Sequence, residues 1–315
     1  MKILIYTFLE EDLAWKLKQH YIQDEIIQTK DRNIALKEVV DSDILILNIK
    51  DEEVIENGKK LKLIQTLSSG VDYLPLDLIK SRNIILCNTA GIHSGHMSEY
   101  AISSMILLAR NLHVAIRNQT KHIWNQQLDQ HEIAGSTIGI LGLGSIGKEL
   151  ARKANFMGMK VVGIRKHPKK MENVDEVYSI DDIDKLIKQS DYIVNLLPLT
   201  KETEKIINKE FFEKMKNTAC LINMGRGPTT DQKAMYEALI NKTIRGVVSD
   251  VFFMEPLEEN SLLWDLENLV ITPHICGFVS NYMDKAIKVI KPNLDMIHEE
   301  KQAELINQVD LKLGY

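Results

Sequence analysis

The sequence predicts an α/β protein with two domains, the larger of which contains a doubly wound parallel sheet. Short apolar runs alternate with helical patterns along the whole chain, as in a parallel sheet with helices on both faces. The 315 residues are enough for two domains of ordinary size. A glycine-rich turn near the middle joins an apolar run to a helical pattern, as in dinucleotide-binding sheets.

The strands are predicted from apolar runs rich in β-branched residues. In the first part of the chain they are residues 3–6, 44–47, 63–67 and 84–87. A second series of six is expected at residues 137–141, 160–164, 192–196, 219–223, 246–251 and 269–272. A helix is expected at 96–116, where apolar residues recur at intervals of three and four. Further helices are expected at 148–157, after the glycine-rich turn, and at 282–299.

The two series of strands divide the chain into domains. We expect a dinucleotide-binding domain at residues 97–284 and a discontinuous substrate-binding domain at residues 1–96 and 285–315. The first domain is discontinuous because the last predicted helix follows the second series, and no low-complexity linker separates the halves.

Composition excludes several classes of function. A formal charge of −5 leaves no basic excess for nucleic-acid phosphates, and no apolar run is long enough to span a membrane. The apolar start of the chain is predicted to be a buried strand rather than a signal peptide. Three widely spaced cysteines, an odd number, favour free thiols. We therefore expect a cytoplasmic protein that binds neither nucleic acid nor membrane.

The glycine-rich turn has the sequence Gly142-Leu-Gly144-Ser145-Ile146-Gly147. In such a motif the first glycine permits a tight turn, the second lets backbone amides approach a pyrophosphate, and the third allows close packing of the helix. The amino terminus of the helix then offers unpaired N–H groups and a positive dipole end. Alone, the spacing also fits an ordinary glycine-rich turn, but its position between strand and helix favours a dinucleotide site.

The segment after the next strand indicates which dinucleotide is bound. An NAD site usually has an acid there to bind the ribose hydroxyls, but the sequence has Arg165 and Lys166, with no acid before Glu172. Arginine suits a 2′-phosphate, so NADP(H) is the favoured cofactor and NAD(H) a possible one. The alternative is a solvated basic loop.

Three later segments suggest catalysis. Arg226 lies between glycines after one predicted strand, Glu255 follows another, and His274 follows the last. A guanidinium can bind the carboxylate of a 2-oxo acid and polarise its ketone. A histidine near neutral pH can supply the proton that the developing alkoxide needs, and a carboxylate can orient it and raise its pKa.

Each of these residues also has an ordinary structural interpretation. Arg226 could be a surface turn residue, Glu255 could begin a helix, and His274 could be a capping or packed side chain. The ordered set after a phosphate-binding turn favours catalysis. Cys276 lies close to His274, but no separate base is placed for it, so a packing role is preferred over a nucleophile.

With these motifs the sequence resembles the D-isomer-specific 2-hydroxyacid dehydrogenase family, nearest the glyoxylate/hydroxypyruvate and 2-ketoacid reductase branches. The resemblance covers nearly the whole chain and rests on segments 68–72, 142–147, 197–203, 223–227, 250–256 and 272–274. It implies a Rossmann domain, a flavodoxin-like substrate domain, a homodimer, and reduction of a small 2-oxo acid to a D-2-hydroxy acid. It also makes Arg226, Glu255 and His274 the catalytic residues.

The resemblance implies binding residues as well. The backbone amides of Ser69, Gly70 and Val71 would bind the substrate carboxylate. Asp250 would face the nicotinamide amide. The remaining positions implied to line the cofactor are Pro198, Thr203, Met224 and Gly277.

Three positions depart from the family pattern, which puts the shape of the pocket in question. They are Thr230, where valine is usual, Ser249, where leucine is usual, and Cys276, where glycine or alanine is common. The alternative functions are a non-catalytic nicotinamide-sensing interaction protein of the same fold and a phosphoglycerate dehydrogenase-like activity. A sensor would not need the complete set of Arg226, Glu255 and His274. Formate oxidation is disfavoured because no formate-type segment is recognised in the first domain.

Overall fold

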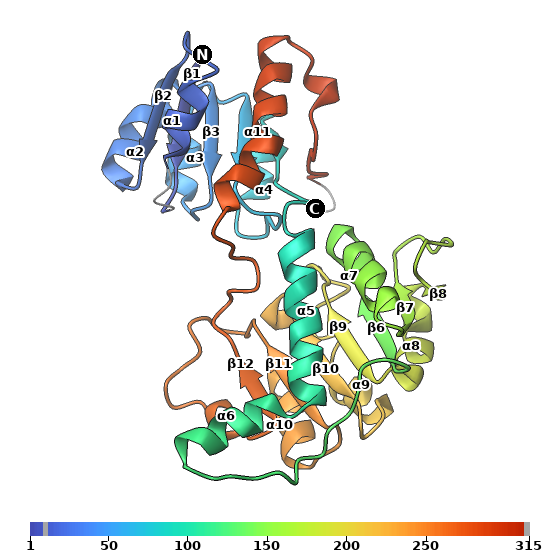
Figure 1. The fold of residues 1–315 in the computed structure, drawn as a ribbon. Helices are drawn as coiled ribbons and strands as arrows, with labels where there is room; N and C mark the ends of the chain where they lie inside the picture. The colour runs from blue at the N-terminus through green and yellow to red at the C-terminus, as the bar shows by residue number, and fades with distance from the viewer. Residues whose placement is uncertain (9–11, 312–315) are drawn as a thin grey trace. The chain divides into compact units, whose positions relative to one another are not determined.

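The computed structural model describes residues 1–8 and 12–311, which form two compact units (Figure 1). Unit 1 consists of Met1–Ile92 and Val279–Tyr315, and unit 2 of His93–Phe278. The chain therefore leaves unit 1 once and returns to it once. The domain boundaries expected from the sequence lie a few residues further along the chain at both places.

Unit 1 is built on a parallel sheet whose strand order is β2-β1-β3-β4-β5. Because this is the flavodoxin-like order, the structure confirms the fold class predicted for this part of the chain. The strands are β1 Lys2–Tyr6, β2 Glu25–Thr29, β3 Ile44–Leu47, β4 Leu63–Thr66 and β5 Ile85–Cys87. The helices are α1 Leu13–Lys18, α2 Arg32–Glu38, α3 Glu52–Asn57, α4 Leu76–Ser81 and α11 Tyr282–His298.

Helices cover both faces of this sheet. The buried side chains of α1 and α11 pack with Ile3 and Ile44 on one face. Those of α2, α3 and α4 pack with Leu4 and Leu45 on the other. Strand β2 was not predicted, because only one of its five side chains is buried and the segment has no continuous apolar run.

Unit 2 is built on a seven-stranded parallel sheet of order β12-β11-β10-β9-β6-β7-β8, which is the doubly wound Rossmann arrangement. Its strands are β6 Thr137–Leu141, β7 Lys160–Ile164, β8 Glu176–Tyr178, β9 Tyr192–Asn195, β10 Cys220–Asn223, β11 Gly246–Ser249 and β12 Leu269–Ile271. Its helices are α5 Ser94–Ala109, α6 Leu112–Thr120, α7 Ser145–Phe156, α8 Ile183–Gln189, α9 Lys209–Lys214 and α10 Gln232–Ile240.

Short 3-10 turns complete the secondary structure of the described residues. They are η1 Val39–Asp41, η2 Ile180–Asp182, η3 Gly227–Thr229, η4 Leu262–Asp265 and η5 Gln302–Glu304.

In unit 2 the helix predicted at 148–157 begins three residues earlier, as α7, and four predicted strands are one or two residues shorter. Two differences are larger. The helix expected at residues 96–116 is two helices, α5 and α6, because Asn111 adopts a left-handed conformation with φ of 49°. The strand β8 was not predicted. Its three side chains are only partly buried, and its sequence, Glu-Val-Tyr, is not an apolar run.

The register of the second sheet determines where the loops emerge. Backbone pairing places the last residues of six strands in one row, namely Ile164, Leu141, Asn195, Asn223, Ser249 and Ile271. The loops that follow these strands all leave from the same edge. In open α/β sheets this carboxyl edge is where ligands bind, and the reversal of strand order lies between β6 and β9.

Among the described residues, no helix combines the length and the apolar composition that crossing a membrane requires.

Candidate active site

The phosphate-binding turn lies between β6 and α7, as the sequence predicts. Gly142 has φ of +108°, a conformation that side chains with a Cβ atom rarely adopt. Gly144 is the N-cap of α7, and Ser145 and Ile146 form its first turn, while Gly147 is buried against the rest of the unit. The free N–H groups at the start of this twelve-residue helix are suited to bind a pyrophosphate.

The end of β7 is adjacent to this turn. The amide of Leu143 donates to the carbonyl oxygen of Ile164 at 3.0 Å, and Arg165 is the next residue. The side chain of Arg165 is half-buried, and its Nη1 lies 3.9 Å from the sulfur of Met171. Lys166 is exposed. A cation therefore follows β7 at the position where an NAD site usually has an acid.

A buried network of asparagine side chains stabilises the turns after β9 and β10. No role was predicted for these asparagines from the sequence. The Nδ2 of Asn195 donates to Oδ1 of Asn223 at 2.9 Å and to Thr229 at 2.8 Å. The Nδ2 of Asn223 donates to the hydroxyl of Thr230 at 3.1 Å. Each asparagine ends a buried strand, which is the signal that would have identified the network. The departure at Thr230 is explained, because valine could not accept this hydrogen bond.

The turn after β9 contains two of the residues expected to line the cofactor. The hydroxyl of Thr203 donates to the carbonyl oxygen of Pro198 at 2.6 Å and accepts from the amide of Thr200 at 2.8 Å. Pro198 is exposed and Thr203 is buried. Met224, directly after β10, is also buried, and its amide donates to Asn195 at 3.1 Å.

Arg226 lies in the turn after β10, where the backbone approaches the end of β11. A Cβ atom on Gly227 would lie only 1.8 Å from the carbonyl oxygen of Phe252, so a glycine is required for this approach. Phe252 in turn is three residues before Glu255, and its amide donates to Oε1 of Glu255 at 2.9 Å. The turn of Arg226 and the segment of Glu255 are therefore packed directly together.

Glu255 and His274 form a hydrogen-bonded pair. The Nδ1 of His274 lies 2.7 Å from Oε2 of Glu255, and because a carboxylate only accepts, Nδ1 is the donor. This leaves Nε2 as the nitrogen that can exchange a proton with a ligand. The His274 side chain is 50% exposed, so solvent and ligands can reach this residue.

The electrostatics of the pair favour its charged form. The hydrogen bond to Glu255 raises the pKa of His274 above its usual value of 6.5, and burial and Arg226 oppose the shift. Burial alone would raise the pKa of Glu255, but its hydrogen bonds with His274 and the Phe252 amide, together with Arg226, lower it below the usual 4.5. His274 is therefore suited to hold a proton at neutral pH.

Asp250 holds the loop that carries His274. Its fully buried Oδ1 accepts from the Thr272 hydroxyl at 2.5 Å and from the Ile275 amide at 2.9 Å, and its Oδ2 accepts from the Cys276 amide at 3.0 Å. His274 lies inside this loop with φ of 54°, and its own amide donates to the Asp250 carbonyl at 2.9 Å. Hydrogen bonds on both sides therefore impose the left-handed conformation of His274.

The end of this loop is also bound. The carbonyl oxygen of Gly277 lies 3.0 Å from Nε2 of His96. Cys276 is 5% exposed and packs in the core, and burial raises the pKa of its thiol well above the usual range. A protonated, buried thiol fits the packing role rather than that of a nucleophile.

Ser69, Gly70 and Val71 lie in unit 1, directly after β4. The Ser69 carbonyl accepts from Asn88 Nδ2 at 3.0 Å, and the Gly70 carbonyl accepts from the Ser68 hydroxyl at 2.9 Å. Val71 is buried, and its carbonyl accepts from the amide of Leu74 at 3.0 Å. The carbonyl groups of residues 69–71 therefore accept hydrogen bonds within unit 1.

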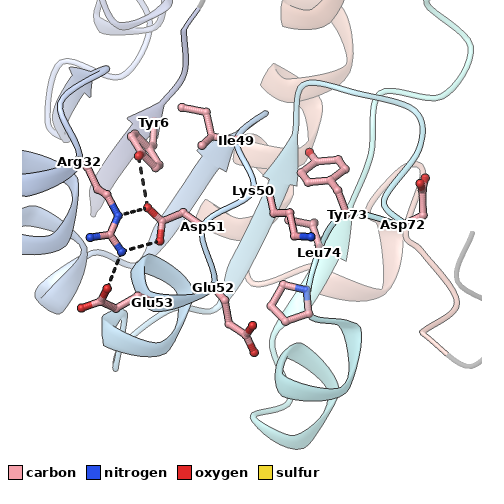
Figure 2. A pocket seen from close by; sticks show the side chains of 11 residues that line it. Tyr6, Arg32, Ile49, Lys50, Asp51, Glu52, Glu53, Asp72, Tyr73 and Leu74 are labelled. Carbon is pink, nitrogen blue, oxygen red and sulfur yellow. Dashed lines mark hydrogen bonds and ion pairs between the residues drawn. The ribbon is translucent and has the colours of Figure 1, made fainter. Parts of the chain in front are cut away.

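A cavity of about 680 Å³ opens next to this segment, at the carboxyl edge of the first sheet. It is lined by Tyr6 from β1, by residues 49–53 after β3, and by residues 72–75, which directly follow Val71. In Figure 2 Arg32 pairs with Asp51 and Glu53 at one end, while Lys50, Tyr73 and Asp72 lie toward the other. The β1/β3 switch point of a flavodoxin-like sheet is a usual ligand site, and this volume suits a small molecule.

The sequence and the fold are similar to those of known proteins. The sequence profile of the D-isomer specific 2-hydroxyacid dehydrogenase NAD binding domain matches residues 102–276. The hydroxypyruvate reductase of Thermotoga maritima is 33% identical over 251 residues, which are 78% of this chain and 81% of that protein. The D-3-phosphoglycerate dehydrogenase of Methanocaldococcus jannaschii is 33% identical over 87% of this chain, but the chain spans only 53% of its length.

A solved structure shows the same fold over the whole chain. The NADPH-dependent glyoxylate/hydroxypyruvate reductase of Sinorhizobium meliloti, in complex with NADP and sulfate, has a TM-score of 0.88 and 26% identity. The match covers 100% of this chain and 99% of that one.

We predict that Glu255→Gln lowers the pKa of His274. Glutamine keeps a hydrogen-bond acceptor but loses the charge that favours the imidazolium, so burial and Arg226 would then dominate. The imidazole signals of His274, followed by NMR against pH, should titrate above 6.5 in the wild type and at lower pH in the variant. Glu258→Gln, close by in sequence, is the control and should leave the titration unchanged. Equal midpoints in the wild type and Glu255→Gln would contradict the pairing.

We also predict that His274→Gly is more stable than His274→Ala by about 1 kcal/mol, since a left-handed residue other than glycine costs roughly 1–2 kcal/mol. Both variants lose the imidazole, so the comparison isolates the backbone strain. Urea unfolding measures the difference. Ser103 in the middle of α5 is the control, because there glycine should be the less stable of the two by about 1 kcal/mol. If alanine is also the more stable at position 274, the backbone there is not strained.

Proposed function

The chain belongs to the D-isomer-specific 2-hydroxyacid dehydrogenase family of NAD(P)-dependent dehydrogenases and reductases, and from this premise we propose that it reduces a small 2-oxo acid to the D-2-hydroxy acid. The observation that carries the proposal is the hydrogen-bonded His274–Glu255 pair beside the turn of Arg226. A protein that only senses nicotinamide would need the phosphate-binding turn but not this acid pair.

The proposed reaction adds a hydride and a proton across the ketone of the substrate. When bound, the nicotinamide cofactor supplies the hydride, which goes to the substrate's C2 carbon. His274 donates the proton from Nε2 to the ketone oxygen as the carbon–oxygen double bond becomes a single bond. Glu255 keeps the proton of Nδ1 in place and stabilises the imidazolium before the transfer. Reduction should therefore slow as the pH rises through the raised pKa of His274.

The substrate carboxylate has two proposed partners. The guanidinium of Arg226 would bind it with fork geometry, and the backbone amides of Ser69, Gly70 and Val71 would donate to it.

The function is tested by measuring NADPH and NADH oxidation with a graded set of 2-oxo acids. The set is glyoxylate, hydroxypyruvate, pyruvate, branched-chain 2-oxo acids and phosphohydroxypyruvate, the last to test the phosphoglycerate dehydrogenase-like alternative that the Methanocaldococcus relative supports. His274→Ala should lower kcat about a hundredfold to ten-thousandfold. Arg226→Lys should raise KM for every active substrate. A stable wild type that binds cofactor but reduces none of the set would favour the sensor alternative.

The proposed cofactor preference is for NADPH and depends on Arg165. A hydrogen bond to a charged group contributes about 1.5–3 kcal/mol, which corresponds to roughly ten- to a hundredfold between the cofactors. Arg165→Asp should reverse the ratio of kcat/KM for NADPH and NADH, because aspartate repels the 2′-phosphate and accepts from the ribose hydroxyls. Lys188→Asp on α8 is a control for the change of charge. If the wild type prefers NADH, the proposed cofactor preference is wrong, while the proposed reaction is unaffected.

The homodimer expected from the resemblance also remains a proposal. Its support is a run of exposed apolar side chains on α6 and just after it, including Ile116 at 58%, Ile123 at 51% and Trp124 at 90% exposure. Sedimentation velocity tests it against the 36.0 kDa mass of one chain.

A further inference from the structure

The chain passes between the two units at two points. Within unit 2, a hydrogen bond from His96 connects the segment after the first point with the segment before the second. Unit 2 begins at His93 and ends at Phe278. His96 lies in the first turn of α5, directly after the first crossing, and Gly277 lies directly before the second. The Nε2 of His96 and the carbonyl oxygen of Gly277 are 3.0 Å apart. Because a carbonyl can only accept, Nε2 of His96 carries hydrogen and donates it.

The same helix also binds the other end of the loop that carries His274. Tyr100 is one helical turn after His96, so both side chains lie on one face of α5. The Tyr100 hydroxyl lies 2.5 Å from the Thr272 hydroxyl, which itself donates to Asp250. Because the Thr272 hydroxyl donates its hydrogen to Asp250, the Tyr100 hydroxyl is the donor to Thr272. Burial raises the pKa of Tyr100 to about 12, so the phenol keeps its proton. Thr272 precedes His274 by two residues and Gly277 follows it by three.

The start of α5 is itself held to the helix that follows the phosphate-binding turn. The Nζ of Lys153 on α7 donates to the Gly95 carbonyl at 2.9 Å and pairs with Glu99 at 3.0 Å. The rings of His93 and His96 are 5.4 Å apart between centroids, and His93 is buried. His96 therefore belongs to a backbone segment that is held from α7, the helix that runs beside α5 in Figure 1.

We propose that His96 is a positioning residue for the proton donor: through Gly277 it fixes the end of the His274 loop and couples the two crossing segments. The proposal rests on the proposed reduction, since the group it positions is His274. Asp250 holds the loop from the sheet, and His96 holds it from α5. Without His96 the contacts with Asp250 would remain, but the loop beyond Cys276 would lose the hydrogen bond to α5.

The test is a double-mutant cycle of His96→Ala and His274→Ala, measured as kcat for the best 2-oxo acid. One neutral hydrogen bond accounts for a loss of about two- to tenfold in kcat for His96→Ala. In the His274→Ala background the same change should have no further effect, because no proton donor is left to position. Equal losses in both backgrounds would overturn the proposal, since they would mean that His96 acts independently of His274.

A pair of conservative variants separates positioning from folding. The amide nitrogen of glutamine can take the place of Nε2, whereas asparagine is too short to reach Gly277. His96→Gln should keep kcat within about twofold of the wild type, and His96→Asn should show the loss expected for alanine. Ser103→Ala, on the exposed side of α5, is the control and should behave as the wild type. Equal kcat values for the glutamine and asparagine variants would contradict the hydrogen bond.

Hydrogen exchange gives a readout that does not need activity. Amide exchange in residues 275–278 should be faster in His96→Asn than in His96→Gln or the wild type, at matched stability. If the wild type reduces no 2-oxo acid but this difference is present, the proposed function fails while the loop contact holds. If exchange is the same in all three proteins, His96 does not hold the loop, and the proposal is overturned.

Discussion

Six parallel strands of unit 2 end in one row, and the proposed cofactor and catalytic residues of this unit follow that row closely. Backbone pairing sets the row: Leu141 lies opposite both Ile164 and Asn195, and Asn223 lies opposite Ser249. A slip of one residue in any strand would turn its buried side chains to the wrong face and move its loop along the edge. The register of the sheet is therefore the constraint on which the site depends.

Buried polar groups then determine the shape of each loop. The amides of Asn195 and Asn223 bond each other and the threonines that follow, and the Asp250 carboxylate accepts three hydrogen bonds from the His274 loop. A buried polar group without a partner costs about 1–3 kcal/mol, so these networks specify one loop conformation over others. The left-handed backbone at His274 is the strained element that they hold in place.

The three departures from the family pattern leave the catalytic pair intact. Thr230 joins the asparagine network and Cys276 fills the core. The hydroxyl of Ser249 donates to the Val251 carbonyl at 2.8 Å, just before the segment of Glu255. Two of the three departures thus add hydrogen bonds around the loops at the strand ends, and the third adds packing.

The sequence by itself determined the fold class and most strands, because fully buried parallel strands are continuous apolar runs; residues 44–47, 137–141 and 160–164 have the predicted bounds. It also singled out Arg226, Glu255 and His274, because their residue types and order follow from the chemistry and the resemblance. Partly buried strands such as β2 and β8, and the break at Asn111, have no such pattern and were not predicted.

Only the tertiary structure decided which partners these residues have. The pairing of His274 Nδ1 with Glu255, the anchoring of the loop by Asp250, and the contact of His96 with Gly277 join residues that are 19 to 181 positions apart. No local pattern encodes such contacts, because they depend on the order and register of strands that the chain brings together only on folding.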